Sequence, residues 1–373
     1  MSYDCAVEID SKPSRPRWLP VLIVVILAGG ASCTPTLGVP QVSQVAVHEE
    51  TRLQREMAVS MFQARRIRLA RISTRLRVDS SELCGDLVAP FYGFVARSLS
   101  DISEEYRDTV ARLWRFGDQP TVELVDPGSP AEEAGLEQGW KIARINGTEV
   151  RDERGVIEAV GSADGSNLEL ELAGERAGQV VEIVPVTACR FPVMLEIANT
   201  VNAFADGSNV FIASGMVKFV ENDEELALVV GHEMAHNILD HVSKQQGNYM
   251  AGGLLGLLLD LGAAAAGVNT GGAGQSIGAS LGAGVSASGF ESEADYMGAY
   301  IAARAGYDVS GAPLLWRRMA VEHPGSIDGA FMASHPSTPE RFVALGKTVE
   351  EIEERRAAGE PLVPRVAVEG QEE

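Results

Sequence analysis

Two histidines and a glutamate lie in one short segment, at a spacing that suits metal binding and the activation of water. The segment from Gly231 to His236 reads G-H-E-M-A-H. On a helix, residues four apart project from the same face, so His232 and His236 can bind one zinc ion together. Glu233, between them, can deprotonate a water on that zinc. The alternative is a chance match on an ordinary amphipathic helix.

The residues before this motif predict the helix that carries it. Asn222 can cap the helix, and Glu225 three residues later is typical of a capping box. Leu226, Val229 and Val230 then provide an apolar face. The motif therefore lies in a segment that has both a signal for the start of a helix and an apolar face that can be buried.

A catalytic zinc needs three protein ligands and one open position, so a third ligand must come from elsewhere in the chain. Glu291 is the best candidate, because it starts a stretch of small apolar residues at helical spacing that ends at Gly306. Asp295 lies on the same face one turn later, whereas Glu293 points elsewhere. We expect Glu291 to bind the metal and Asp295 to accept the outer N–H of a ligand histidine. A solvated acidic helix start is the alternative.

His241 also follows the motif closely, but its spacing argues against metal binding. It lies nine positions after His232, half a turn out of phase on a helix of 3.6 residues per turn. We expect His241 to lie at the surface or beside a metal ligand, and not on the metal itself.

Three motifs in the second half of the chain match those of a known peptidase family. The first is the segment 231–236; the second reads E-S-E-A-D at 291–295 and matches the family's E-x-x-A-D. The third, S-H-P at 334–336 with Arg341, matches S-H-P-x(4)-R. The chain resembles the gluzincin peptidases that include HtpX, the CAAX-prenyl protease and the periplasmic outer-membrane-assembly proteases. The resemblance covers roughly residues 191–346.

This resemblance implies a zinc endopeptidase with one Zn²⁺ per chain. The two motif histidines and Glu291 would hold the metal, and Glu233 would pass the proton of the attacking water to the leaving amine. His335 would reach the metal site, where it could stabilise the oxyanion or occupy the open zinc position as a latch. Arg341 would orient that loop or pair with a carboxylate.

The segments 202–205 and 210–215 resemble the strands that this family has before its zinc helix. Substrate backbone is expected to add as a strand along four of these residues: Val210, Phe211, Ile212 and Ala213. The expected substrates are extended or misfolded polypeptides of the cell envelope. Two other classes compete, a non-proteolytic chaperone or adaptor and an integral membrane protease. Glu233 argues against the first, because a pure binder needs no general base, and the single short apolar N-terminal run argues against the second.

The N-terminus predicts export. Residues 18–32 are almost wholly apolar and follow Arg15 and Arg17, but they are shorter than the roughly 20 residues of a membrane span. Cys33 comes next and resembles a bacterial lipoprotein cleavage site, although Gly30 stands where leucine is usual. We therefore expect a periplasmic protein held to the membrane by a lipid on Cys33. An uncleaved anchor or plain secretion is the alternative.

The charge balance argues against one class of partner. The chain has a formal net charge of −21, and residues 1–32 contain as many acids as bases, so their removal leaves this value unchanged. Nucleic acids and anionic lipids are therefore not expected partners.

Two cysteines remain once the export segment is set aside. Cys5 lies in the predicted signal and Cys33 at its end, which leaves Cys84 and Cys189. In an exported protein such a pair can form a disulfide, and two free buried thiols are the alternative. The two cysteines flank a segment whose sequence pattern differs from that of the rest of the chain.

That segment resembles a PDZ domain of the bacterial protease type. A strand at 122–125 leads through glycine-rich turns to I-A-R-I-N-G at 142–147. Residues 91–94 would form the loop whose backbone N–H groups capture a chain terminus. Trp140 departs from the usual pattern, and the stretch 97–121 separates the loop from the next clear strand. A purely structural PDZ-like module is the alternative.

The expected fold class is α+β, with a mainly helical gluzincin peptidase domain that contains a small sheet and an inserted, mostly-β PDZ-like domain. The predicted parts are a signal and lipoprotein cysteine at 1–33, a helical arm packing on the peptidase at 34–90, the PDZ-like domain at 91–190, the peptidase at 191–350 and an acidic tail at 351–373.

Two helical segments leave alternatives open. The arginine-rich arm could instead lie on a membrane surface. The glycine-rich stretch 247–289 is expected to form two short, tightly packed helices or a lid over the cleft, with membrane contact as the alternative.

Overall fold

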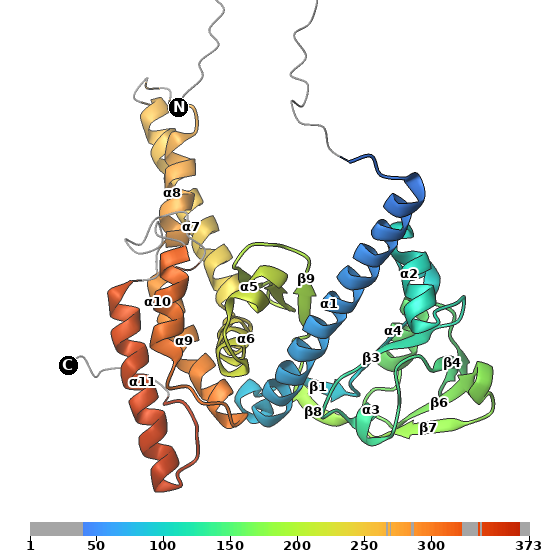
Figure 1. Ribbon diagram of the computed structural model, residues 1–373. Coiled ribbons are helices and arrows are strands. Elements are labelled where there is room, and N and C mark those ends of the chain that lie inside the picture. The colour runs from blue at the N-terminus through green and yellow to red at the C-terminus, as the bar shows by residue number, and fades with distance from the viewer. Residues whose placement is uncertain are drawn as a thin grey trace, which may run out of the picture. The chain divides into compact units, whose positions relative to one another are not determined.

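The computed structural model describes residues 40–265, 268, 270–284, 287–322, 335 and 338–365. Residues before His48 form a unit of their own, of which only the start of the first helix is described. The predicted signal, Cys33, both neighbours of His335 and the end of the acidic tail lie outside the described residues. From His48 onward the elements assemble as the α+β class that the sequence predicts (Figure 1).

Helix α1 (Gln44–Asp79) forms most of the arm predicted at 34–90. In its C-terminal half, Leu69, Ile72 and Leu76 join the main hydrophobic core around the peptidase strands and helices. Val59, further forward, belongs to a separate small cluster with Val110 and Phe116. The arm therefore packs on the peptidase, as expected, and also on the PDZ-like part.

The PDZ-like part is one antiparallel sheet with short helices. Its strands pair in the order β2-β3-β4-β6-β7, with β5 added to β4. The strands are β2 (Phe94–Arg97), β3 (Thr121–Val125), β4 (Lys141–Ile145), β5 (Thr148–Glu149), β6 (Leu168–Ala173) and β7 (Val180–Ile183). The helices are η2 (Leu99–Asp101), α2 (Glu104–Trp114), α3 (Pro130–Glu133), α4 (Glu153–Gly161) and η3 (Gly174–Arg176).

The unexpectedly long stretch 97–121 has a structural explanation. It forms α2, whose Val110 packs beside Val59 of α1, and Arg112 of α2 pairs with Glu56 of α1 at 2.8 Å. The extra residues therefore attach the PDZ-like part to the arm.

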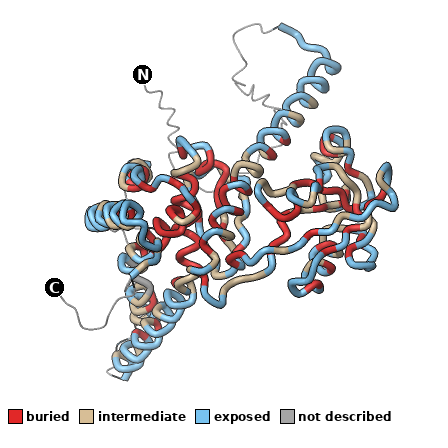
Figure 2. The backbone as a smooth tube through the Cα atoms, turned by 90° about the horizontal axis from the view of Figure 1, so that it is seen from below, coloured by how far each residue is buried: buried red, intermediate tan, exposed pale blue. Residues whose placement is uncertain are grey.

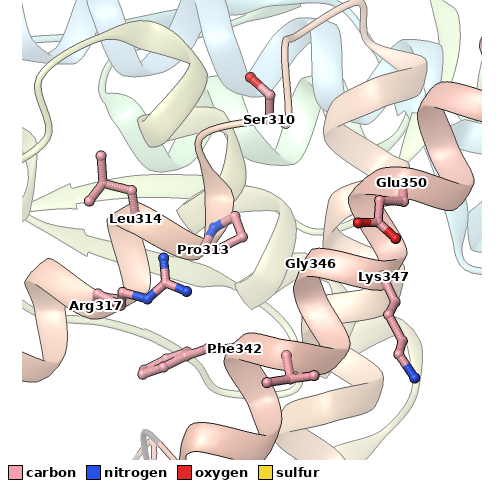
Figure 3. A pocket seen from close by; sticks show the side chains of 9 residues that line it. Ser310, Pro313, Leu314, Arg317, Phe342, Gly346, Lys347 and Glu350 are labelled. Carbon is pink, nitrogen blue, oxygen red and sulfur yellow. The ribbon is translucent and has the colours of Figure 1, made fainter.

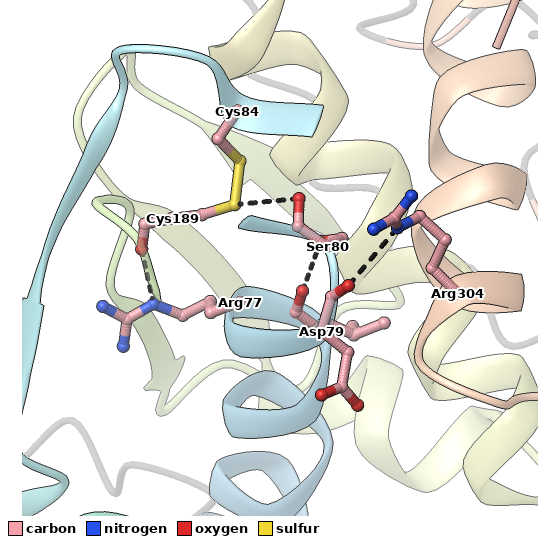
Figure 4. Close-up of a disulfide and its surroundings, with 7 residues drawn as sticks. Arg77, Asp79, Ser80, Cys84, Cys189 and Arg304 are labelled. Atoms are coloured by element: carbon pink, nitrogen blue, oxygen red, sulfur yellow. Dashed lines mark hydrogen bonds between the residues drawn. A yellow bond between two sulfur atoms is a disulfide. The ribbon is translucent and has the colours of Figure 1, made fainter. Parts of the chain in front are cut away.

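A two-stranded ladder forms the neck between the two parts. β1 (Val88–Phe91) pairs antiparallel with β8 (Val186–Cys189), after the short helix η1 (Ser81–Cys84). Cys84 and Cys189 are joined as a disulfide in the structure, with their Cα atoms 5.7 Å apart (Figure 4). Arg77 of α1 donates from Nε to the Cys189 carbonyl at 2.9 Å. The chain thus enters and leaves the PDZ-like part through one ladder, and the predicted start at residue 91 falls inside β1.

The peptidase part combines a small sheet with helices. Its strands β9 (Val193–Glu196), β10 (Ala203–Ala205) and β11 (Val210–Ala213) pair in the order β10-β11-β9. The helices are α5 (Ser214–Phe219), α6 (Asp223–Ile238), α7 (His241–Ala265), α8 (Ala273–Gly284), α9 (Ala287–Arg304), α10 (Ala312–Glu322) and α11 (Pro339–Ala358). The main core and the PDZ-like core are separate groups of buried residues, drawn red in Figure 2.

The predicted substrate strand needs a correction. Residues Val210 to Ala213 do form a strand, but β11 pairs with β10 along one edge and with β9 along the other. Its backbone hydrogen-bonding groups are therefore taken on both sides, and Val210 and Ile212 are fully buried. A substrate cannot add to this strand, because an added strand needs a free edge.

Candidate metal centre

Helix α6 carries the zinc motif and is buried on every side. The Asn222 side chain accepts the N–H of Glu225 at 2.8 Å, as the capping pattern predicts. The Glu225 carboxylate accepts the N–H of Glu221, and not that of Asn222, so the predicted capping box does not close. Every residue from Glu225 to Asn237 is buried. A helix apolar enough to be buried all round holds its polar motif inside the protein, away from water.

Helix α9 crosses α6 at a pair of glycines. A Cβ added to Gly231 would lie 2.7 Å from the carbonyl oxygen of Gly298, and one added to Gly298 would lie 2.7 Å from the backbone nitrogen of His232. Real Cβ atoms essentially never come that close to backbone atoms. The two backbones can therefore touch only because both residues are glycine. This contact brings the turn of His232 beside Glu291.

Four side chains meet at one point: His232 and His236 from α6, Glu291 from α9, and His335. One donor atom of each lies within 4.8 Å of the others. Nε2 of His232 is 3.1 Å from Nε2 of His236, and Glu291 carboxylate oxygens lie 3.5 and 3.4 Å from these two nitrogens. Ligands at about 2.0–2.1 Å from a tetrahedral zinc stand about 3.3 Å apart, so the spacing fits this ion.

The base and His335 face the same cluster. Glu233 is buried, and its Oε2 has no hydrogen-bond partner among the described residues. Nδ1 of His335 lies 3.0 and 3.1 Å from the two oxygens of Glu291, and its Nε2 lies 3.7 Å from Oε1 of Glu233. A buried carboxylate oxygen with spare accepting capacity suits a group that takes a proton from water.

Asp295, on the Glu291 face of α9, contacts His232. Its Oδ1 lies 3.0 Å from Nδ1 of His232 and also accepts the indole N–H of Trp316 at 2.8 Å. Arg341, which is 4% exposed, forks onto Asp295 with bonds of 2.8 and 2.9 Å. Its third nitrogen lies 2.9 Å from the Glu291 carboxylate. Arg341 therefore pairs with two buried carboxylates, one of the two roles expected for it.

His241 lies beside His236 in the way that Asp295 lies beside His232. It is 2% exposed, so the expectation of a surface position is wrong and that of a place beside a ligand holds. Its Nδ1 lies 3.1 Å from Nδ1 of His236, and its Nε2 lies 2.9 Å from Oε2 of Glu293. The ring also stacks on Phe290, with centroids 4.5 Å apart. Glu293 points away from the cluster, as predicted, but holds this outer histidine.

Asn237 is a residue that the sequence alone does not single out. Its side-chain oxygen accepts the N–H of Gly207 at 2.7 Å, and its amide donates to the Asn209 carbonyl at 2.9 Å. Gly207 and Asn209 lie in the turn between β10 and β11. Because Asn237 directly follows His236, it ties the sheet to the metal cluster. Asn237 is missed in the sequence because a neutral amide next to a histidine motif carries no metal-binding or acid–base signal of its own.

The electrostatics of the cluster favour a bound cation. Burial opposes a charge on His232, but hydrogen bonds with Asp295 and Glu291 outweigh it and raise the pKa to about 10. Burial would raise the pKa of Glu291, yet the charge of His335 and bonds from the two motif histidines hold that pKa well below its usual range. Two carboxylates that stay ionised in a buried site need positive charge beside them; Arg341 supplies it to both, and a metal ion held by the cluster would add to it.

A separate pocket of about 550 Å³ lies between α10 and α11 (Figure 3). It is lined by Leu314 and Phe342 together with Arg317, Lys347 and Glu350, and by no member of the metal cluster. It is therefore not the cleft over the candidate metal site.

Comparison with known proteins agrees with this geometry. Residues 184–349, which contain the whole metal cluster and Arg341, match the model of peptidase family M48. This part of the chain is similar to the peptidases of that family. Residues 121–174 match the PDZ domain, so the M48 part is preceded by a PDZ domain. Both matches confirm the resemblance seen in the motifs.

The relatives of the M48 part are mitochondrial proteins. The mitochondrial metalloendopeptidase OMA1 of Saccharomyces cerevisiae is 29% identical over 161 residues, which cover 39% of this chain and 43% of the yeast protein. OMA1 of Arabidopsis thaliana is 29% identical over 177 residues, covering 46% of this chain and 34% of that protein. The chain thus spans less than half the length of these curated relatives. Among solved structures, the HtrA3 PDZ domain bound to a phage-derived ligand (FGRWV) is 25% identical over 27% of this chain and 88% of its own, with a TM-score of 0.21.

Proposed function

We propose that this protein is a zinc-dependent endopeptidase that hydrolyses unfolded or misassembled polypeptides of the bacterial cell envelope. The observation that carries the proposal is the buried cluster of His232, His236 and Glu291, whose spacing fits zinc and which has a base and His335 beside it. The match of residues 184–349 to the model of family M48 supports the same reaction. A chaperone or adaptor would need neither the donor set nor a buried carboxylate with spare accepting capacity.

The residues divide the chemistry between them. His232, His236 and Glu291 would hold one zinc ion, and that ion would supply Lewis acidity toward a bound water and the scissile carbonyl. Glu233 accepts the proton of the attacking water and delivers it to the leaving amine. Asp295 holds the imidazole ring of His232 in position, and His241 does the same for the ring of His236.

His335 acts as a latch in this proposal. Its ring contacts Glu291 and lies near Glu233, so it competes for the open zinc position. Substrate entry requires it to move, and His335→Ala is expected to raise the rate of cleavage of a short peptide several-fold. A fall of a hundredfold or more would instead assign it to oxyanion stabilisation.

Substrate backbone adds to β10 in place of β11. β10 lies at the end of the strand order, and within the described residues no strand pairs with its second edge. It packs against α6, and the contacts of Asn237 tie its turn to the end of the zinc motif. Phe204 of β10, 37% exposed, stacks on Phe211 of β11 with centroids 4.8 Å apart. A free edge beside the metal is the geometry that an extended peptide needs.

The location follows from the N-terminal sequence. A lipid on Cys33 would hold the protein to the membrane from the periplasmic side, and the PDZ domain would hold clients for cleavage. In Cys33→Ser the protein should leave the membrane fraction. A Cys33→Ser variant that stays membrane-bound and unprocessed would show that residues 18–32 form an anchor.

The reaction is tested by metal analysis and by digestion of casein with and without a chelator. The purified protein should carry about one zinc per chain and lose cleavage with the chelator. Glu233→Gln should keep the zinc but lower the cleavage rate by roughly 10²–10⁴-fold, because only the base is removed. Glu224→Gln, the same change on the same helix away from the cluster, is the control. Full activity in Glu233→Gln would remove the enzyme proposal.

A further inference from the structure

Helices α7 and α8 form a hairpin with an apolar surface that the protein leaves uncovered. α7 is long and apolar enough to cross a membrane by length and composition, yet only 11% of its most apolar window is buried. The large apolar side chains of the hairpin are between 36% and 72% exposed; they include Met250, Leu254, Leu255, Leu257, Leu258, Leu259, Leu261, Ile277 and Leu281. Soluble proteins rarely expose so much contiguous apolar surface without a partner for it.

Glycines hold the two helices together. A Cβ on Gly252 would meet the carbonyl oxygen of Gly278 well inside van der Waals contact, and one on Gly256 would meet that of Gly274 in the same way. Gly282 approaches the Asn248 carbonyl equally closely. Glycines four apart on both helices are the pattern by which helices pack in lipid, where close backbone contact replaces the hydrophobic effect.

The apolar surface covers more than half of the circumference of α7 and lies beside the glycine stripe. At about 100° per residue, the exposed apolar side chains between Met250 and Leu261 cover an arc of roughly 200°, while Gly252 and Gly256 face α8. A protein partner covers one face of a helix, whereas lipid surrounds it. The distribution therefore favours a lipid environment.

The charge of the hairpin fits the same environment. From residue 245 to residue 284 its sequence contains one charged residue, Asp260. That carboxylate accepts the N–H groups of Gly274 and Gln275 at 2.9 and 2.8 Å, so it is satisfied inside the hairpin. Lys244 is exposed at the base, before the apolar part begins. Hydrocarbon requires that every polar group of an inserted segment be satisfied within it.

The length of the hairpin decides how far it can extend into a lipid bilayer. From Tyr249 to Ala265, α7 is about 25 Å long at 1.5 Å per residue, less than the roughly 30 Å of a bilayer core. Both ends of the hairpin return to the peptidase, because α7 follows α6 and α8 leads to α9.

We propose that the α7–α8 hairpin enters one leaflet of a lipid bilayer and returns without crossing it. α7 begins five residues after His236 (241 − 236), and α9, which follows α8, carries Glu291. Insertion therefore holds the metal cluster at the membrane surface. The substrates favoured by this position are polypeptide segments that emerge from or lie along the bilayer. The lipid contact goes beyond the proposed reaction and does not depend on it.

Tryptophan fluorescence in reconstituted vesicles tests the insertion. Leu258→Trp in the full lipoprotein is placed in vesicles of phosphatidylcholine with or without bromine on the acyl chains. The added emission should shift to the blue and be quenched by the brominated lipid. Ile157→Trp, at a site 64% exposed on α4 of the PDZ domain, is the matched control and should show neither change.

Two results would overturn the proposal. Emission from Leu258→Trp that stays red and unquenched would mean that the hairpin lies in water. A blue shift without quenching, together with a dimer mass in light scattering, would mean that a second copy covers it. Neither result bears on zinc content or casein cleavage, so the reaction and the insertion can fail separately.

Discussion

Two pairs of helices in this protein cross at glycines, and only one pair is buried. At the α6–α9 crossing, Gly231 and Gly298 bring together backbones whose other side chains fill the core. At the α7–α8 crossing, Gly252 and Gly256 do the same for helices whose leucines face outward. The difference teaches that backbone contact serves two purposes. In the core, the close backbone contact sets the distance between the candidate metal ligands. In the hairpin, it leaves the apolar side chains pointing outward.

The two crossings also differ in which residues would move if the two helices separated. Glu291 lies on α9 two turns before Gly298, and His232 directly follows Gly231. A helix displaced there carries metal ligands with it. The close neighbours of the hairpin glycines belong to α7 and α8 themselves, so displacement there changes the hairpin and leaves the cluster in place.

The largest effect is expected from Gly298→Val at the buried crossing. The new side chain would meet the backbone of His232, which cannot rotate away, so the helices must separate. Overpacking of this kind costs typically 1–3 kcal/mol, and the separated ligands should no longer hold zinc. Metal content and thermal unfolding measure both. Gly289→Val, on the same helix in open space, is the control, and normal zinc content in Gly298→Val would break the distinction between the crossings.

The next effect concerns how His236 is held inside the buried site. His241→Leu removes the ring beside Nδ1 of His236, and loss of such an outer partner typically lowers metal affinity by 10–100-fold. Competition with a zinc chelator measures the affinity. Glu293→Gln should change it far less, because the amide oxygen still accepts a hydrogen bond from His241. Equal losses in the two variants would mean that the negative charge of Glu293, and not only its hydrogen bond, is needed for His241 to hold His236.

A smaller effect on the metal site and on cleavage is expected at the neck, where a disulfide and not a glycine holds two segments close. Cys84→Ser opens a loop with a sequence separation of 105 residues. The chain-entropy model gives about 4–5 kcal/mol for such a loop as an upper figure. Cleavage of a large unfolded substrate should fall, because the PDZ domain is then held less firmly, while cleavage of a short peptide changes little. Equal losses on both substrates would assign the bond to peptidase folding, and free thiols in peptide maps of the exported protein would end the hypothesis.

The smallest effect on cleavage is expected from Gly256→Val at the exposed crossing. The side chain would push α8 away from α7, because it meets backbone atoms there. Zinc content and peptide cleavage in detergent should stay within about twofold of the original protein, while lipid quenching of the tryptophan at position 258 should weaken. Loss of zinc in Gly256→Val would show that the hairpin and the metal cluster form one cooperative unit.

Relations within a single helix could be predicted from the sequence. The shared face of His232 and His236, the pairing of Glu291 with Asp295 and the cap at Asn222 all follow from the fixed geometry of 3.6 residues per turn. The same reasoning failed where the helix ended. Asp240, with a φ of 56°, interrupts the chain between α6 and α7, so the phase counted from His232 does not apply to His241.

Relations between elements were decided by the tertiary structure. The sequence by itself determined which side chains could bind zinc, which segment forms a PDZ domain and which cysteines were left to pair. Only the fold decided that β11 lies in the middle of its sheet, that Arg341 reaches two carboxylates, and that Asn237 ties the sheet to the zinc helix. The physical reason is that local spacing fixes directions along one element, whereas the neighbours of that element depend on how all the apolar surfaces are buried together.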